Sequence, residues 1–319
     1  MNINNIHIIL ESIVGSKAYG LSTESSDTDR KGFGLAPKEY YISHNKRFEQ
    51  IELSSDKEDR TIYNITKFFT LAEDCNPNIL DVLFVNEKDI LSITPVGEEV
   101  LANRDIFISK KAKHTFSGYA FAQLKRIKTH RNWLLSPPLQ EPIRDQFHLP
   151  NHHRLLSSTD MGILSKLEEV DHQLFQSALN NITYETYQNE KSYNAARGNW
   201  EKFQNWKATR NPQRAALEKQ HGYDTKHAMH LVRLLRMGKE ILSGVGVLVQ
   251  RPDREELLAI RNGNRSYEDL IEEVEKLNKD MDVLYISSQL PHKPNSKKIE
   301  DLCCKILDKH LNNSRSYLQ

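Results

Sequence analysis

The stretch that decides the fold is "IVGSKAYGLSTESSDTDRKGF", residues 13–33. An apolar run ends in Gly15-Ser16, a polar loop follows, and then Asp27 and Asp29 stand one residue apart. In a strand, residues i and i+2 point to the same face, so these two carboxylates are expected side by side. Neighbouring carboxylates repel each other unless a cation lies between them. Mg²⁺ fits that need, because it prefers hard oxygen ligands and shares them with substrate phosphates.

The residues around this pair extend the hypothesis to phosphoryl chemistry on a metal template. Gly15-Ser16 offers a backbone that approaches a phosphate closely, with N–H and hydroxyl donors, and Lys17 adds a cation. A third carboxylate is expected from a neighbouring strand, where Asp59 is the first candidate and Glu58 the alternative. "SSDTD" is also a good turn sequence, and Asp-x-Asp is common on protein surfaces. The order of the elements, rather than either motif alone, favours the functional interpretation.

Composition indicates the class of protein. A chain of 319 residues with 38% hydrophobic and 27% charged residues is typical of a soluble globular protein of one large or two ordinary domains. It has no apolar run of roughly 20 residues and no signal-peptide pattern, so we expect a cytoplasmic protein with no membrane partner. The net charge of +1 argues against a strongly basic nucleic-acid binder, although residues 106–140 contain Lys and Arg but no Asp or Glu.

The hydrophobic pattern predicts an α+β fold. Short apolar or alternating runs predict strands at residues 11–16, 27–35, 47–53 and 59–64, followed by helices at 65–75 and 76–84. After about residue 105 the spacing becomes helical, at residues 110–135, 165–182, 197–211 and 223–244, with two more helices within 254–285. We therefore expect a small mixed-sheet domain over residues 1–105 and a mostly helical domain over 106–319.

Four motifs carry a resemblance to a known family: "GSKAYGL" (15–21), "SDTD" (26–29), "DRTIYNITKF" (59–68) and "NPNILDVLF" (76–84). Together they resemble the DNA polymerase beta-like nucleotidyltransferase superfamily. Within it the chain looks like a branch of predicted nucleotidyltransferases of bacteria and large bacteriophages. "FSGYAFAQLKRI" (116–127) and "GYDTKHAMHLVRLLRMGKEIL" (222–242) extend the likeness into the helical half. One departure is Asp81, where the family usually has Glu; the shorter side chain keeps an acceptor with less reach.

The resemblance implies a function. Residues 1–105 would be the nucleotidyltransferase domain and 106–319 a substrate-binding domain. The protein would move a nucleoside monophosphate from a nucleoside triphosphate (NTP) to a hydroxyl of RNA, a protein or a small molecule, with Mg²⁺ or Mn²⁺ as cofactor. Gly15 and Ser16 would hold the triphosphate, and Asp27, Asp29 and Asp59 would be the catalytic metal ligands. Asp59 is preferred to Glu58 because its spacing matches the family's "DxxIYxLxKF".

The helix expected at residues 223–244 carries basic residues on one face and apolar residues on another. Spacing alone favours a half-buried helix with a solvated basic side. His227 and His230 are three residues apart, but no further ligand accompanies them at a zinc spacing. The resemblance favours a functional face that contacts nucleotide phosphates or the acceptor, formed by Lys226, His227, His230 and Arg233.

Alternatives from other classes stay open. The aromatic and basic residues of "NWEKFQNWKATRN" (199–211) are able to stack on bases, and helix packing explains them equally well. One rival is a non-catalytic nucleic-acid-binding protein that keeps the fold. Another is a toxin or antitoxin-type regulator whose transfer modifies a tRNA or a protein.

Overall fold

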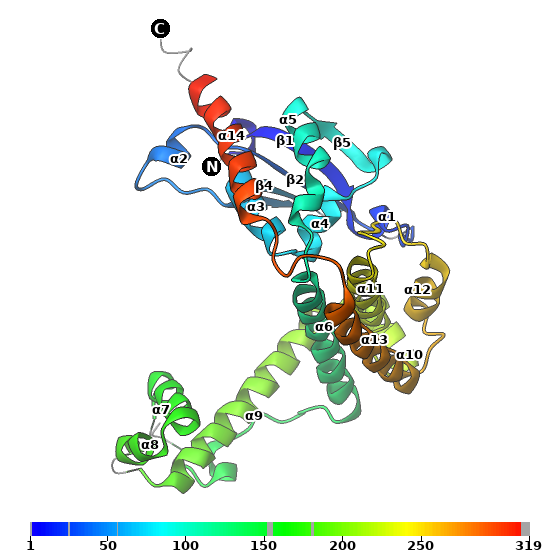
Figure 1. Ribbon diagram of the computed structural model, residues 1–319. Helices are drawn as coiled ribbons and strands as arrows, with labels where there is room; N and C mark the ends of the chain where they lie inside the picture. The colour runs from blue at the N-terminus through cyan, green and yellow to red at the C-terminus, as the bar shows by residue number, and fades with distance from the viewer. Residues whose placement is uncertain (1, 25, 56, 152–155, 180–181, 314–319) are drawn as a thin grey trace. The chain divides into compact units, whose positions relative to one another are not determined.

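The chain has an α+β fold, as the sequence predicts: a mixed sheet formed near the N-terminus, followed by a mostly helical region (Figure 1). The computed structural model describes residues 1–319 with the exception of 1, 25, 56, 152–155, 180–181 and 314–319.

The sheet has five strands in the order β3-β4-β2-β1-β5. Strands β2 and β4 are parallel, and the other neighbouring pairs are antiparallel. The strands are β1 (His7–Val14), β2 (Thr28–Leu35), β3 (Gln50–Ser54), β4 (Glu58–Asn64) and β5 (Ile90–Ile93).

The described residues form two compact units, and helix α6 contributes residues to both. Residues 1–127 and 223–319 make the first, which holds the sheet and α1 (Gly15–Ala18), α2 (Glu39–Ile42), α3 (Ile65–Glu73), α4 (Pro77–Leu83), α5 (Pro95–Ala102), most of α6 (Ala112–Leu135), α11 (Thr225–Leu242), α12 (Arg254–Arg261), α13 (Tyr267–Ser287) and α14 (Ser296–Asn313). Residues 128–222 make the second, with α7 (Ser158–Val170), α8 (His172–Leu179), α9 (Tyr184–Thr209) and α10 (Pro212–His221). Short 3₁₀ turns lie at Ile3–Asn5, Glu87–Asp89, Arg104–Phe107 and Arg144–Phe147.

The units divide the chain differently from the predicted domains. Helices α11 to α14 belong to the unit that contains the sheet, whereas the predicted helical domain begins at residue 106. The apolar core explains the grouping, because buried residues of α11 such as Leu231 and Leu235 belong to the same cluster as Phe33 of β2. That residues 1–105 and 106–319 are separate domains stays a prediction.

Helix α3 shows how local sequence builds this core. It follows β4 directly, and its buried residues Ile65, Phe68, Phe69 and Ala72 follow the i, i+3, i+4, i+7 spacing of one helical face. The Phe68 ring stacks on that of Phe33, with centroids 4.2 Å apart. This helix therefore covers the sheet face on which Phe33 lies.

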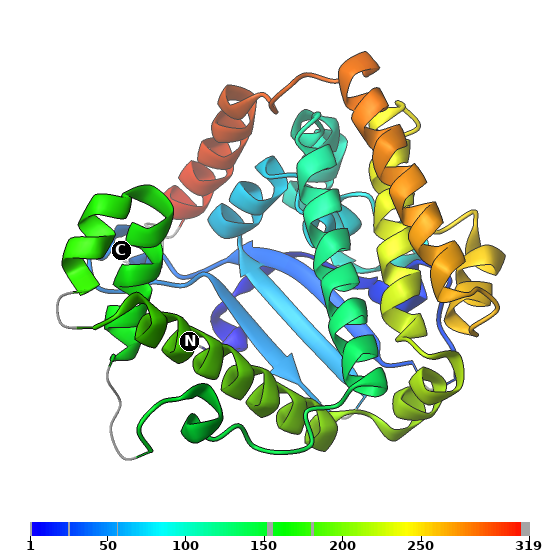
Figure 2. The ribbon, with the colours of Figure 1, turned by 90° about the horizontal axis from the view of Figure 1, so that it is seen from below.

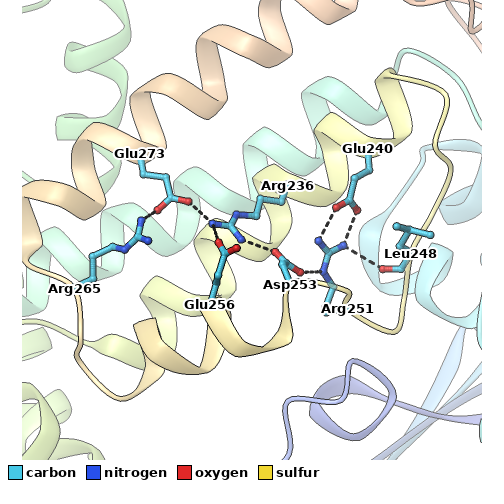
Figure 3. A network of polar contacts seen from close by, with 8 residues as sticks. All are labelled: Arg236, Glu240, Leu248, Arg251, Asp253, Glu256, Arg265 and Glu273. Atoms are coloured by element: carbon cyan, nitrogen blue, oxygen red, sulfur yellow. Dashed lines mark hydrogen bonds and ion pairs between the residues drawn. The ribbon is translucent and has the colours of Figure 1, made fainter.

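Helices α11, α12 and α13 lie side by side and are joined by a chain of ion pairs (Figures 2 and 3). Arg251 is its most buried member. Its side chain is 0% exposed and contacts Glu240 at 2.6 Å and Asp253 at 2.8 Å. Asp253 in turn accepts from Arg236 at 2.7 Å, which continues the chain to Glu273 at 2.7 Å. The network fixes the segment between α11 and α12 on its neighbours.

Replacement of Arg251 by methionine is expected to lower the free energy of unfolding by roughly 3–5 kcal/mol, because it removes the buried cation that pairs with Glu240 and leaves Asp253 with Arg236 alone. Lys305→Met is the control, since Lys305 pairs with Glu99 while its side chain is 54% exposed. That change should cost less than about 1 kcal/mol. Urea unfolding measures both, and equal losses would contradict the assigned importance of the Arg251 network.

Several elements differ from the predicted ones. The first strand is His7–Val14, and Gly15-Ser16 begins the one-turn helix α1 instead of ending the strand. The segment 165–182, predicted as one helix, lies on α7 and α8. Asp171 ends α7 with an extended backbone and caps α8 by accepting from the N–H groups of Gln173 and Leu174. Strand β5 was not predicted. It has four residues, too few for a clear alternation.

Candidate active site

Two of the predicted carboxylates lie on neighbouring strands in register. Asp29 of β2 pairs with Asp59 of the parallel strand β4, and Val14 of β1 pairs with Asp29 on its other side. Because directly paired residues share a face of the sheet, Asp29 and Asp59 point the same way. Asp27 precedes β2 by one residue, and its charge interacts with that of Asp29. The structure therefore brings Asp27, Asp29 and Asp59 together at one end of the sheet.

Glu58 lies on the opposite face. It precedes Asp59 by one residue, and its carboxylate pairs with Arg30 at 3.1 Å. Arg60 on that same face forms a two-bond contact with Glu11, 2.7 Å for each bond. The alternation of the strands thus favours Asp59 over Glu58 as the partner of Asp29.

Gly15 lies directly against Asp29. Its φ of +68° is in the left-handed region, and a Cβ added there would fall 2.1 Å from Oδ2 of Asp29. Ser16 is partly buried, and its carbonyl accepts from the N–H of Leu21 at 2.8 Å. Lys17 is exposed, and its Nζ donates to Oγ1 of Thr28 at 2.5 Å. The Gly-Ser turn and the aspartates are therefore adjacent in space as well as ordered in sequence.

Electrostatics at this end of the sheet favour a bound cation. Burial raises the pKa of the Asp29 carboxyl, and the charges of Asp59 and Asp27 raise it further, while Lys31 and Lys226 oppose them. Three carboxylates with a glycine in place of a bulkier neighbour form an oxygen-rich donor set of the kind that Mg²⁺ or Mn²⁺ takes. The chemistry of these carboxylates suits a divalent metal, and that they hold one is a proposal.

Helix α11 distributes its four predicted site residues differently. Lys226 is exposed, and its charge lowers the pKa of Asp29. His227 is buried, and its Nδ1 lies 2.5 Å from Asp224, whose carboxylate also accepts from the His227 N–H and caps the helix. His230 is partly exposed. Arg233, expected on a solvated face, is 6% exposed, because its guanidinium packs over the ring of Tyr19.

Sequence reasoning did not place three polar residues beside this site, although it noted Asp81 as a departure from the family pattern. Lys31 is two residues after Asp29, so it lies on the same face, and its Nζ donates to Asn78 at 3.0 Å. Tyr19 and Asp81 are 4% and 3% exposed, and the Tyr19 hydroxyl donates to the Asp81 carboxylate. The alternation after Asp29 was a usable signal for Lys31. No spacing rule links Tyr19 with Asp81.

Asp81 makes stability depend on pH. Burial raises its pKa, although Arg233, the Tyr19 hydroxyl and Lys31 lower it in part. An acid with a raised pKa binds its proton more tightly in the folded state, so the wild type loses stability as the pH rises from about 4 through that raised pKa. Asp81→Asn removes this dependence. In urea unfolding between pH 4 and 8, the stability of the variant relative to wild type should increase with pH, by roughly 1.4 kcal/mol per pH unit within the window. A difference that stays constant with pH would contradict this.

The loop that leads from α1 toward Asp27 is held by arginine-containing segments far along the chain. The N–H of Arg251 donates to the carbonyl of Tyr19 at 3.1 Å. Arg254 Nε donates to the carbonyl of Gly20 at 2.6 Å, and Arg261 Nη1 to that of Leu21 at 2.9 Å. Three consecutive carbonyls are thereby fixed by the α12 region.

The predicted nucleic-acid features make internal contacts. Trp206 packs with Trp133 at a centroid distance of 5.3 Å, and Arg210 lies 4.1 Å from the Trp206 ring while pairing with Glu218. In the stretch without acidic residues, Lys113 pairs with Asp282 at 2.7 Å. Helix packing therefore accounts for Trp206, and residues elsewhere neutralise part of the basic stretch.

The family-model match covers the N-terminal part of the chain, which contains the sheet. Residues 1–136 match the model of the RlaP family, described as an RNA repair pathway DNA polymerase beta family. This confirms the polymerase beta-like resemblance over those residues. None of the helices that the structure describes is long and apolar enough to cross a membrane.

One curated relative is a phage protein. The "uncharacterized 38.9 kDa protein in nrdC-mobD intergenic region" of Enterobacteria phage T4 is 27% identical over 128 residues. The match covers 37% of this chain and 38% of the phage protein. No solved structure matches the chain.

Proposed function

Taking the polymerase beta-like character of residues 1–136 as the premise, we propose that the protein is a metal-dependent nucleotidyltransferase that moves a nucleoside monophosphate from an NTP to a hydroxyl acceptor. The observation that carries the proposal is the register of Asp29 with Asp59, with Gly15 lying against the Asp29 carboxylate. A surface Asp-x-Asp turn would need neither a third carboxylate in register nor a glycine at this place.

Each residue has a role in this proposal. Asp27, Asp29 and Asp59 hold Mg²⁺ or Mn²⁺, which supplies charge neutralisation on the triphosphate and lowers the pKa of the attacking hydroxyl. Asp59 accepts the proton of that hydroxyl. Gly15 and Ser16 bind the triphosphate through N–H and hydroxyl donors, with Lys17 as an added cation.

Helix α11 would take part from the other side of the nucleotide. Lys226 is exposed and lowers the pKa of Asp29, which supports a contact between Lys226 and a phosphate near the carboxylates. His230, which is partly exposed, is proposed to contact the nucleotide or the acceptor. His227 is proposed to reach the nucleotide only through its Nε2, because Nδ1 faces Asp224.

For the acceptor we propose RNA, because the matching family model is described as belonging to an RNA repair pathway. The test incubates purified protein with each alpha-labelled NTP, Mg²⁺ or Mn²⁺, and total RNA, protein extract or metabolites in separate reactions. We expect label in RNA only when a divalent metal is present. Label in protein would keep the activity and overturn the acceptor. RNA binding with no transfer from a folded protein would favour the non-catalytic alternative.

A further inference from the structure

A buried polar cluster lies beside the candidate site, formed by Tyr19, Asp81 and Arg233. We infer that these three are positioning residues, which act through Tyr19 to hold the Gly15-Ser16 turn in the orientation that receives a triphosphate. The inference rests on the proposed function. In this inference Arg233 does not contact a phosphate itself and affects triphosphate binding only through Tyr19.

Tyr19 is fixed at four points. It directly follows α1, and its N–H donates to the carbonyl of Gly15 at 3.0 Å. Its own carbonyl accepts from the N–H of Arg251 at 3.1 Å. The hydroxyl donates to Asp81 of α4, and the ring lies under the guanidinium of Arg233 of α11, 3.9 Å from its centroid. Neither α1 nor the chain that leaves it is able to rotate without breaking one of these contacts.

Arg233 contacts protein groups rather than solvent. Its Nη1 lies 3.0 Å from Sδ of Met237, and its position over the Tyr19 ring is a cation–π contact. Its buried Nε has no hydrogen-bond partner among the residues that the structure describes. A guanidinium 6% exposed is poorly placed to bind a phosphate from solvent.

Asp81 supplies the buried acceptor for the Tyr19 hydroxyl. It is 3% exposed, and its second oxygen, Oδ1, has no hydrogen-bond partner within the described part of the chain. Buried charges with incomplete hydrogen bonding add little stability, and apolar residues of similar size often replace them without loss. Such groups are better explained by a demand on orientation, and here the group they orient is Tyr19, whose hydroxyl also interacts electrostatically with Asp29.

The experiment separates positioning from plain stability with Tyr19→Phe, which removes one hydroxyl and keeps the ring. Hydrogen exchange of the free protein should show about tenfold faster exchange of the backbone amides of residues 15–21, because the buried hydrogen bond from Tyr19 to Asp81 is lost. The affinity for a magnesium–NTP, measured by calorimetry, should fall about tenfold. Affinity for the matching nucleoside, which lacks the triphosphate, should not change.

Tyr187→Phe is the matched control, because Tyr187 is also buried and its hydroxyl donates to Glu168 at 2.9 Å in the other compact unit. It should leave exchange at residues 15–21 and NTP affinity as in wild type. Arg233→Met and the double variant with Tyr19→Phe complete a cycle. If the two residues act together, the double variant weakens NTP binding less than the product of the single changes.

The outcomes distinguish the inference from the function on which it rests. Unchanged exchange at residues 15–21 in Tyr19→Phe overturns the positioning role. Loss of NTP affinity in Arg233→Met with none in Tyr19→Phe assigns Arg233 a direct phosphate contact and also overturns it. Faster exchange in a protein whose wild type binds no NTP overturns both the proposed function and the assigned purpose of the cluster.

Discussion

Replacement of Asp29 by asparagine is expected to reduce NTP-dependent transfer by at least about 1000-fold. The proposed metal contributes several kcal/mol of charge stabilisation, and each 1.36 kcal/mol corresponds to a tenfold change in rate. Asp29 is the central member of the carboxylate group, since its charge interacts with those of both Asp27 and Asp59. The initial rate of label transfer at saturating Mg²⁺ measures the effect. The variant should remain folded, because an amide at this site relieves repulsion between carboxylates.

The matched control for Asp29→Asn is Glu58→Gln. Glu58 is adjacent in sequence to Asp59, yet it lies on the opposite face and pairs with Arg30 across a partly exposed contact. Its loss should change the transfer rate less than about twofold, since such a pair contributes about 1 kcal/mol or less to stability. Equal losses in Asp29→Asn and Glu58→Gln would contradict the assignment of the site to one face of the sheet.

Replacement of Gly15 by alanine is expected to lower the transfer rate about 100-fold. The new Cβ would fall 2.1 Å from Oδ2 of Asp29, so either the turn or the carboxylate must move. A displacement of about 1 Å in a catalytic group is sufficient for a loss of this size. Because alanine disfavours a φ of +68°, the free energy of unfolding should also fall, by roughly 1–2 kcal/mol.

Gly20→Ala separates the two effects of Gly15→Ala. Gly20 has a φ of +73°, but a Cβ there would meet only Cδ of Arg254 at 3.7 Å, an ordinary contact. Gly20→Ala therefore introduces the same backbone strain at a position that contacts none of the proposed catalytic groups. Transfer should stay within about threefold of wild type, while the free energy of unfolding falls by roughly 1–2 kcal/mol. If both variants lose activity alike, backbone strain rather than the contact with Asp29 is responsible.

Local sequence patterns were enough to predict several strands and helices of the fold. The strand–turn–strand order around Asp27 and Asp29, the helix after Asn64 and the break before Pro137 all follow from alternation, helical spacing and the geometry of proline. The pairing of Asp59 with Asp29 was expected as well. The register favours Asp59 over Glu58, because one position along a strand moves a side chain to the other face.

The surroundings of the site could not be predicted in the same way. Spacing alone put Arg233 on a solvated face with Lys226 and His230, and the resemblance put it against the nucleotide. Its buried environment is instead set by Tyr19 and Asp81, which come from distant parts of the chain. The four-residue strand β5 carries too few residues for a pattern. In each case a contact between segments far apart in sequence overrides the local signal.

The three carbonyls fixed by the α12 region have a consequence for the order in which the protein is made. Residues 19–21 leave the ribosome early, whereas Arg254 and Arg261, which bind two of these carbonyls, follow 234 and 240 residues after their partners. Closing loops of that length comes late in folding, and domains generally acquire their long-range contacts only once the whole unit has been synthesised. A nascent chain that has reached residue 136 holds every proposed metal ligand, but the loop next to them still lacks the contacts that fix it. The loop beside the proposed metal ligands would thus be fixed only after Arg261 has been synthesised.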